Sequence, residues 1–367
     1  MRLLSYYLVL LLLLAPGASA VDEPARVDVF KAGQEGYHTF RIPSLIVTPK
    51  GTLIAIAEGR KSGRADSGDI DLVMKRSLDR GATWTPLQVI DDDRGNTTGN
   101  PTLVVERESG TIFLLLTRNP GDVKEAEIVD GVAAAGRTVW IMKSIDDGAS
   151  WSRPVEITSS VKKPEWRWYA TGPGIGIQLK SGRLVVPCNH SEAGTRISRS
   201  HIIYSDDRGR TWQLGGVAGD HTNESQVIER ADGTLLWNMR NARVEPQFYT
   251  RATAESTDRG LSWSPTGHDP MLVEPICQAS LVRYRQGELV LFSNPASLKR
   301  ENLTVRVSHD GGRTWPIAKV VYAKPAAYSS LGVLADGSIG LLYENGEAES
   351  YERITFARFS LDWLSMR

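Results

Sequence analysis

An eight-residue motif, S-x-D-x-G-x-x-W, constrains the fold more than any other feature because it recurs along the chain. Its five copies begin at Ser77, Ser144, Ser205, Ser256 and Ser308. In such a turn the Ser and Asp side chains bond nearby main-chain N–H groups, the glycine takes a positive φ, and the tryptophan packs beneath. Identical use in every copy indicates a scaffold role and argues against catalytic aspartates. One Asp and one Ser per copy also offer too few oxygens for a calcium site.

A second repeat is a turn glycine that lies between two short apolar segments. It occurs six times, at Gly51, Gly110, Gly182, Gly233, Gly287 and Gly337. Each glycine therefore marks a hairpin between two buried strands. Successive glycines are 59, 72, 51, 54 and 50 residues apart, which leaves room for four short strands in each repeat. The pattern predicts an all-β fold, a six-bladed β-propeller with four antiparallel strands per blade.

The last repeat predicts how the ring of blades closes. Its hairpin is followed by only one further strand, residues 354–359, so the blade lacks an outer strand. We expect the N-terminal strand, near residues 27–30, to supply it. The resulting single propeller domain spans residues 21–367, and an inserted loop interrupts the strands between Phe113 and Val139.

The N-terminal residues 1–20 predict a secretory signal peptide. Arg2 precedes a leucine-rich stretch, residues 8–14, and Ala18-Ser19-Ala20 forms a small-x-small cleavage site, so we expect cleavage after Ala20 and export to the periplasm or the medium. A membrane anchor is the alternative, but the apolar stretch is shorter than the ~20 residues that span a bilayer.

Composition excludes several classes of protein. Lys+Arg 43 balances Asp+Glu 43, so the chain lacks the charge footprint of a nucleic-acid binder. Two cysteines, Cys188 and Cys277, cannot form a disulfide scaffold and lack zinc-site spacing. Free buried thiols and one disulfide both remain open for them.

Counting outward from the hairpin glycines identifies one polar rim, because residues equally distant from a turn lie side by side. Charged groups at the ends of apolar strands are costly unless they meet one another or a ligand. Three arginines from different blades could bind one carboxylate through their forked guanidinium groups. The alternative is that each arginine caps a strand end or pairs locally. The rim residues are Arg41, Arg60, Asn189, His190, Glu224, Arg240, Arg300, Tyr328 and Glu344.

Several short segments in this order resemble the exo-α-sialidase (neuraminidase) family of glycoside hydrolases. They are FRIP at 40–43, NESQVIE at 223–229, NMR at 238–240, AAYSS at 326–330 and LLYE at 341–344, together with the five Asp-containing turns. The resemblance covers residues 27–363. It implies a six-bladed propeller that removes terminal sialic acids from glycans, glycoproteins or glycolipids.

The resemblance also implies catalytic roles. Tyr328 corresponds to the nucleophile of the family and Glu224 to the glutamate that activates it. The acid/base aspartate lies in GRADSGDID, where Asp66 matches the family spacing better than Asp69 or Asp71, which lie closer to a strand. The expected reaction is retaining hydrolysis through a covalent sialyl-tyrosine.

Substrate-binding roles follow from the same resemblance. Arg41, Arg240 and Arg300 correspond to the three arginines that hold the sialic acid carboxylate. Glu344 corresponds to the residue that orients Arg41, and Arg60 to a further binding arginine. Asn189 and His190 could contact the glycerol or acylamino groups or serve the scaffold, and the same choice applies to Trp166, Trp168 and Tyr169.

Two other functions remain alternatives. A trans-sialidase, intramolecular or not, would transfer the sialyl group to a sugar or to its own glycerol chain. A non-enzymatic sialic-acid-binding lectin would need one of the three catalytic residues to be replaced, and all three are present. The resemblance implies no metal or organic cofactor. We expect a monomer without nucleic-acid binding or stable membrane insertion.

Overall fold

The computed structural model describes residues 23–243, 249–285 and 287–366. Strands make up nearly all of its regular structure, which confirms the predicted all-β class. The described helices are short: α1 (Glu125–Val129), α2 (Thr158–Val161) and α3 (Leu361–Ser365). Among these residues, no helix has the length and apolar character that crossing a membrane requires. The predicted signal peptide lies outside the described residues.

The strands pair in four sheets, within which consecutive antiparallel pairing traces six groups of four strands, here called units 1 to 6. Units 1 and 2 share one sheet, to which the short β11 (Gly174–Ile175) also belongs. Unit 1 contains β2 (Thr39–Val47), β3 (Leu53–Arg60), β4 (Ile70–Ser77) and β5 (Gln88–Asp91). Unit 2 contains β6 (Thr97–Glu106), β7 (Thr111–Asn119), β8 (Thr138–Ser144) and β9 (Val155–Glu156).

Units 3 and 4 form separate sheets. Unit 3 contains β10 (Trp166–Thr171), β13 (Leu184–Glu192), β14 (Ser198–Ser205) and β15 (Gln213–Val217), and β12 (Ile177–Gln178) also pairs with β13. Unit 4 contains β16 (Thr222–Glu229), β17 (Leu235–Asn241), β18 (Thr250–Ser256) and β19 (Gly267–Val273).

Units 5 and 6 share the long strand β23 (Ile317–Val333), which pairs first with β22 and then with β24. Unit 5 begins with β20 (Ser280–Arg283), β21 (Val290–Pro295) and β22 (Glu301–Ser308). Unit 6 continues with β24 (Ile339–Asn345) and β25 (Arg353–Phe359). The N-terminal β1 (Ala25–Lys31) pairs antiparallel with β25, so the predicted pairing of the two ends is confirmed.

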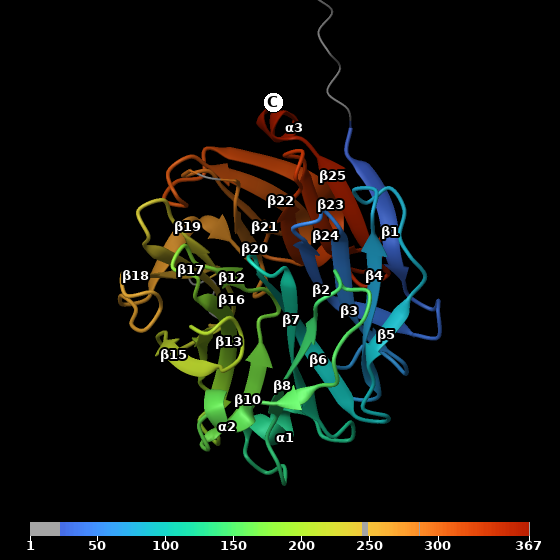
Figure 1. Cartoon of the computed structure of the whole chain (residues 1–367), viewed down its shortest axis with the longest axis vertical. Coiled ribbons are helices and arrows are strands. Elements are labelled where there is room, and N and C mark those ends of the chain that lie inside the picture. The colour runs from blue at the N-terminus through green and yellow to red at the C-terminus, as the bar shows by residue number, and fades with distance from the viewer. Residues whose placement is uncertain (1–22, 244–248, 286, 367) are drawn as a thin grey trace, which may run out of the picture.

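The inner strands of the sheets, which include β2, β20 and the short β12, gather at the centre of the molecule. In Figure 1, β2, β12 and β20 lie near the centre, whereas β5, β15 and β18 lie at the periphery. Contacts run from β2 to β6, from β6 to β11 and β12, from β13 to β16, from β16 to β20, and from β20 through β23 back to β2. Both ends of this ring of inner strands are therefore places where residues distant in sequence meet.

The two repeats form the turns that the sequence predicts. All six hairpin glycines have a positive φ, as at Gly51 with φ 88°. In the first Asp-containing turn, Ser77 Oγ accepts the N–H of Gly81 at 2.8 Å, and Asp79 Oδ1 accepts the N–H of Thr83 at 2.9 Å. The other four copies repeat these contacts.

These turns also join neighbouring units. Gly81 has a φ of 87°, and a Cβ at this position would overlap the ring of Phe356 in unit 6. Each later turn approaches the preceding unit in the same way: Gly148 meets Ile54, Gly209 meets Phe113, Gly260 meets Ile202 and Gly312 meets Leu236.

The apolar core lies between units and leaves one end of the centre to polar groups. Phe30 and Phe356 of unit 6, for example, pack with Phe40 and Leu45 of unit 1. Cys188 and Cys277 are both buried and carry free thiols. Because the core fills the spaces between units, the inner strands can present charged side chains at the centre without disrupting it.

Candidate active site

A polar cavity of about 170 Å³ lies at one end of the inner strands. Residues from units 1 to 6 line it, as expected for the predicted rim. It brings together eight of the ten site residues named from the sequence: Arg41, Arg60, Asp66, Asn189, Glu224, Arg240, Arg300 and Tyr328.

Irregularities in the inner strands direct these side chains into the cavity. The pairing register shifts between Arg41 and Ser44 in β2, between Thr222 and Ser225 in β16, and between Ala326 and Ser329 in β23. Such bulges bend a strand and change the direction of its side chains, and they are common beside active sites. In β2 the bulge places Ile42 at a φ of 59°, which is strained for a β-branched residue.

Tyr328, Glu224 and Arg240 form one hydrogen-bonded group in the cavity. The Tyr328 hydroxyl donates to Glu224 Oε1 at 2.6 Å. Arg240 Nη1 donates both to Glu224 Oε2 at 2.6 Å and to the Tyr328 oxygen at 3.1 Å. The phenol thus has an acceptor for its proton and a cation beside its oxygen, which is the arrangement that an activated nucleophile requires.

The surroundings of Tyr328 keep its phenol neutral. Burial raises its pKa well above the ordinary value of 10.0, the negative charge of Glu224 raises it further, and the nearby arginines oppose this only in part. The carboxylate that accepts this hydrogen bond therefore favours the neutral phenol until the proton is transferred.

Glu344 joins Arg41 to Tyr328 from behind the cavity. Its buried carboxylate accepts Arg41 Nε at 2.8 Å, the N–H of Ile42 at 2.8 Å and the N–H of Tyr328 at 3.1 Å. The carboxylate thereby fixes the guanidinium of Arg41, whose Cζ lies 5.1 Å from the centre of the Tyr328 ring.

Arg300 approaches the same ring from the loop before β22. Its Cζ lies 5.5 Å from the centre of the Tyr328 ring, and its Nη1 donates to the Tyr351 hydroxyl at 2.6 Å. Arg41 also stacks on Tyr351, with its Cζ 4.1 Å from the centre of that ring. Three guanidinium groups therefore surround one phenol, and neither Arg41 nor Arg300 uses all of its donors.

Asp66 reaches the cavity from the loop that follows β3. Its Oδ1 lies 2.7 Å from Arg60 Nη2 and 3.9 Å from Arg41 Nη1. Burial opposes ionisation of Asp66, but Arg60 and then Arg41 outweigh it and lower the pKa of its carboxyl. Because 59% of the side chain is solvent-exposed, the two arginines decide the direction of the shift.

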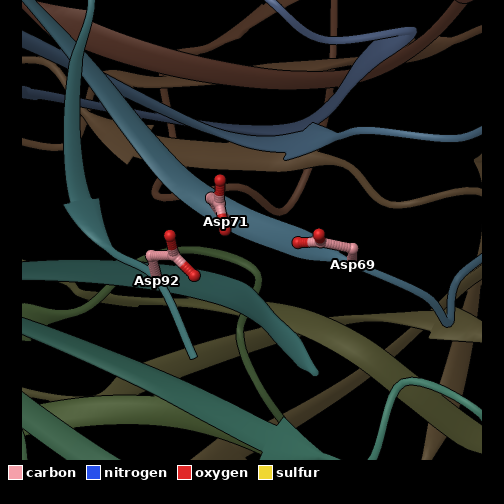
Figure 2. Close-up of side chains that lie close together, drawn as sticks. All are labelled: Asp69, Asp71 and Asp92. Atoms are coloured by element: carbon pink, nitrogen blue, oxygen red, sulfur yellow. The ribbon is translucent and has the colours of Figure 1, made fainter. Parts of the chain in front are cut away.

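Asp69 and Asp71 lie outside the cavity. Figure 2 shows them beside Asp92, and the three carboxylates approach within 4.8 Å of one another. The ammonium of Lys61 lies 2.9 Å from Asp69 Oδ1 and 3.1 Å from Asp71 Oδ2, and the Tyr37 hydroxyl donates to Asp71 Oδ2 at 2.7 Å. The chain itself supplies the cation of this cluster, which fixes the base of the loop that carries Asp66.

Asn189 and His190 are adjacent in β13 but face different surroundings. Asn189 lines the cavity, and its buried Oδ1 and Nδ2 have no hydrogen-bond partner among the described residues. His190 lies away from the cavity lining, stacked 3.5 Å from Trp166 with its Nδ1 3.0 Å from that of His201. Burial, assisted by nearby cations, lowers the pKa of His190 to about 3, so the ring is neutral.

Comparisons with known proteins agree with this geometry. Residues 51–341 match the family model described as BNR repeat-like domain. The chain is 34% identical to a sialidase of Micromonospora viridifaciens, covering 92% of this chain and 54% of that protein. It is 32% identical to an exo-alpha-sialidase of Aspergillus fumigatus, covering 90% and 86%. The chain belongs to the sialidase family. The solved Hadza microbial sialidase Hz136 superposes with a TM-score of 0.83 at 30% identity, covering 92% of this chain and 69% of that one.

Two further residues of the cavity, Glu58 and Arg137, were not identified from the sequence. Glu58 in β3 accepts Arg60 Nη2 at 2.6 Å and the N–H of Asn100 at 2.8 Å. A carboxylate within an apolar strand, two residues before Arg60, was a signal that could have identified it. Arg137 also lines the cavity, where it stacks on Trp168 with Cζ 4.1 Å from the ring centre.

The inserted loop adds one more residue to the cavity of this family member. Glu125, the first residue of α1, lines the cavity together with Arg137. Burial raises the pKa of Glu125, Arg137 lowers it, and Asp66 raises it, with a net upward shift. No motif in the sequence marks either residue.

Proposed function

We propose that this protein is a retaining exo-α-sialidase, which hydrolyses terminal α-linked sialic acids of glycans, glycoproteins or glycolipids. The observation that carries the proposal is the 2.6 Å hydrogen bond from Tyr328 to Glu224, in a cavity where three of the lining arginines surround the phenol. The sialidase names of the relatives support it. Because the chain spans 54% of the Micromonospora protein, the activity is proposed for this chain in its own right.

Substrate recognition in this proposal rests on Arg41, Arg240 and Arg300. Sialic acid carries a carboxylate on its anomeric carbon, and guanidinium groups bind carboxylates with two parallel hydrogen bonds. The neighbouring Asn189 would hydrogen-bond a polar substituent of the sugar, because each buried atom of its amide that stays unpaired costs about 1–3 kcal/mol.

The first chemical step would transfer the sialyl group to Tyr328. The phenol oxygen attacks the anomeric carbon while its proton passes to Glu224 Oε1, and the glycosidic oxygen leaves with the proton of Asp66. A tyrosine nucleophile is a known exception, described for sialidases, to the two-carboxylate scheme of glycosidases. A neutral phenol suits an anionic substrate because a carboxylate nucleophile would repel the substrate carboxylate.

The second step would release the sugar with retained configuration. Asp66, now ionised, takes a proton from water as the water attacks the anomeric carbon, and Glu224 returns its proton to the tyrosine oxygen. Arg240 contacts both Glu224 and the tyrosine oxygen, so it can stabilise the phenolate as negative charge returns to it.

A six-bladed propeller and export to the periplasm or the medium are part of the proposal. Units 1 to 6 would be the blades of one six-bladed propeller domain, residues 21–367, which is supported by the β1 and β25 pairing. Export rests on residues 1–20 alone. N-terminal sequencing of protein recovered from the medium of a secreting host should find Val21 first, and an intact residue 1 would contradict cleavage.

The deciding experiment follows α-linked sialosides by proton NMR. Hydrolysis should first release the α-anomer of free sialic acid, which then mutarotates. First appearance of the β-anomer would refute retention, and a transferred or anhydro product would establish a trans-sialidase instead. Absence of turnover with intact binding would establish a lectin. The Tyr328→Phe variant should lose turnover while it still binds a dehydrated sialic acid analogue, and full activity in this variant would refute the nucleophile.

A further inference from the structure

A second cavity, of about 550 Å³, lies at the opposite end of the same inner strands. In β2, Arg41 lines the polar cavity and Val47 lines this one. At a rise of about 3.3 Å per residue, these two positions lie roughly 20 Å apart. The volume is within the range of about 300–1,000 Å³ that is typical of pockets for small organic ligands.

A belt of hydrogen-bonded polar groups separates the two cavities. Ser44 Oγ donates to the carbonyl of Gly174 at 2.7 Å. The N–H of Leu45 donates to Ser330 Oγ at 3.0 Å, and the N–H of Leu331 donates to Ser280 Oγ at 2.9 Å. These serines are at most 1% exposed, so the second cavity is a site of its own.

The wall of the second cavity is largely apolar and incompletely covered. Five of its aliphatic side chains are only half-buried, whereas Leu45, Leu103 and Leu331 on the same inner strands are fully buried. A concave apolar surface with a few polar groups is the usual form of a ligand site. The five are Val47, Val105, Ile175, Ile177 and Val333.

The rim of this cavity carries excess positive charge. Four basic residues and one acidic residue, Glu229, line it. Arg107 Nη2 donates to the carbonyl of Gln178 at 2.8 Å, Lys180 Nζ to that of Ala231 at 2.6 Å, and Arg283 Nη1 to that of Glu229 at 2.8 Å. Because these partners are main-chain carbonyls, the cations keep charge and donors for an anion. The basic residues are Arg107, Lys180, Arg283 and Arg285.

We propose that this cavity binds a single-chain anionic amphiphile, an alkyl chain that ends in a carboxylate. The alkyl chain would lie against the aliphatic wall, and the carboxylate would bind Arg107, Lys180 and Arg283 at the rim. This site is separate from the proposed sialidase site, so the inference holds whether or not the protein hydrolyses sialosides.

Calorimetric titration of the full protein with octanoate, decanoate and dodecanoate, each below its micelle concentration, tests the apolar wall. Affinity should rise about fourfold for each added methylene, as expected for its removal from water. Dodecanol, which lacks the charge, should bind at least tenfold more weakly than dodecanoate. Equal affinity across the series would overturn the proposal, and so would equal affinity for the alcohol.

Two variants and a matched control test the placement. Lys180→Gln and Arg107→Gln should each weaken dodecanoate binding several-fold, whereas Arg153→Gln, which removes the same charge from an exposed position elsewhere, should not. Turnover of a sialoside should be the same in all three as in the parent protein. Unchanged dodecanoate affinity in both rim variants would overturn the site, as would binding to anionic phospholipid vesicles without binding of free dodecanoate.

Discussion

Replacing Glu344 with glutamine should weaken both the fold and the site, because its carboxylate connects β2 to β23. It accepts N–H groups from Arg41, Ile42 and Tyr328, and its side chain is 0% exposed. Glutamine keeps the shape but has one acceptor oxygen. If that oxygen serves Arg41 Nε and the N–H of Ile42, the new NH₂ group must face the N–H of Tyr328.

The expected loss of stability follows from those contacts. A buried N–H without an acceptor costs about 1–3 kcal/mol. Removing one partner of a buried ion pair costs about 3–5 kcal/mol. Arg41 borders the cavity and is 7% exposed, so water compensates part of its charge. We therefore expect Glu344→Gln to lower the free energy of unfolding by about 3 kcal/mol, at the low end of these values.

Urea unfolding, followed by tryptophan fluorescence, measures this change. Glu347→Gln, at an exposed glutamate near the same strand end, is the control and should change the free energy of unfolding by less than about 0.5 kcal/mol. The double variant Arg41→Met/Glu344→Gln should lose about 2 kcal/mol less free energy of unfolding than the two single variants lose together, because it removes both charges. Sialoside turnover should not return with stability. Additive stability losses would refute the proposed ion pair.

Three further predictions concern pH and loop position. A substrate carboxylate bound to Arg41 offsets part of the positive charge that lowers the pKa of Asp66. The basic limb of the kcat profile should therefore lie at higher pH than the basic limb of the kcat/KM profile, and coincident limbs would contradict this. Lys61→Met should lower kcat more than it changes KM, and Lys61→Arg should restore kcat; a change in KM alone would argue against a positioning role. Burial opposes ionisation of Asp207, but hydrogen bonds from Thr211 outweigh burial and lower the pKa of Asp207 to about 2. The unfolded value is about 3.9. The carboxylate therefore stabilises the fold above pH 4, and this stabilisation is lost as the pH falls toward 2. The unfolding free energy of Asp207→Asn should therefore fall less steeply over that range than that of the parent, and equal slopes would contradict it.

Most parts of the fold that the sequence predicted are those that local contacts determine. The pairing of β1 with β25 is an exception, because it was predicted from the outer strand that the last repeat lacks. The hydrogen bonds of the Asp-containing turn span four residues, as from Ser77 to Gly81, so the motif itself contains both partners. Hairpin glycines likewise act within their own turns. By contrast, nothing local marks β23 (Ile317–Val333) as one strand shared by two units, because only its partners β22 and β24 distinguish its halves.

The site was predictable where its residues lie at a fixed distance from a hairpin. Tyr328 and Glu344, for example, lie on paired strands of one hairpin and meet at the cavity end. Counting failed for His190, because consecutive strand residues face opposite ways and its neighbour Asn189 takes the cavity position. It also missed Arg137, whose contacts with Asn100 and Trp168 join residues from separate strands.

The residues along the inner strands follow one order from the polar cavity to the apolar cavity. Along β2, Arg41 lines the polar cavity, Ser44 belongs to the polar belt and Val47 lines the apolar cavity. The same order holds for Glu224, Gln226 and Ile228 in β16, and for Tyr328, Ser330 and Val333 in β23. A strand that only filled a core would gain nothing from this order, since buried aliphatic residues could occupy all three positions. Its recurrence in three units therefore favours two separate binding sites, one at each end of the ring.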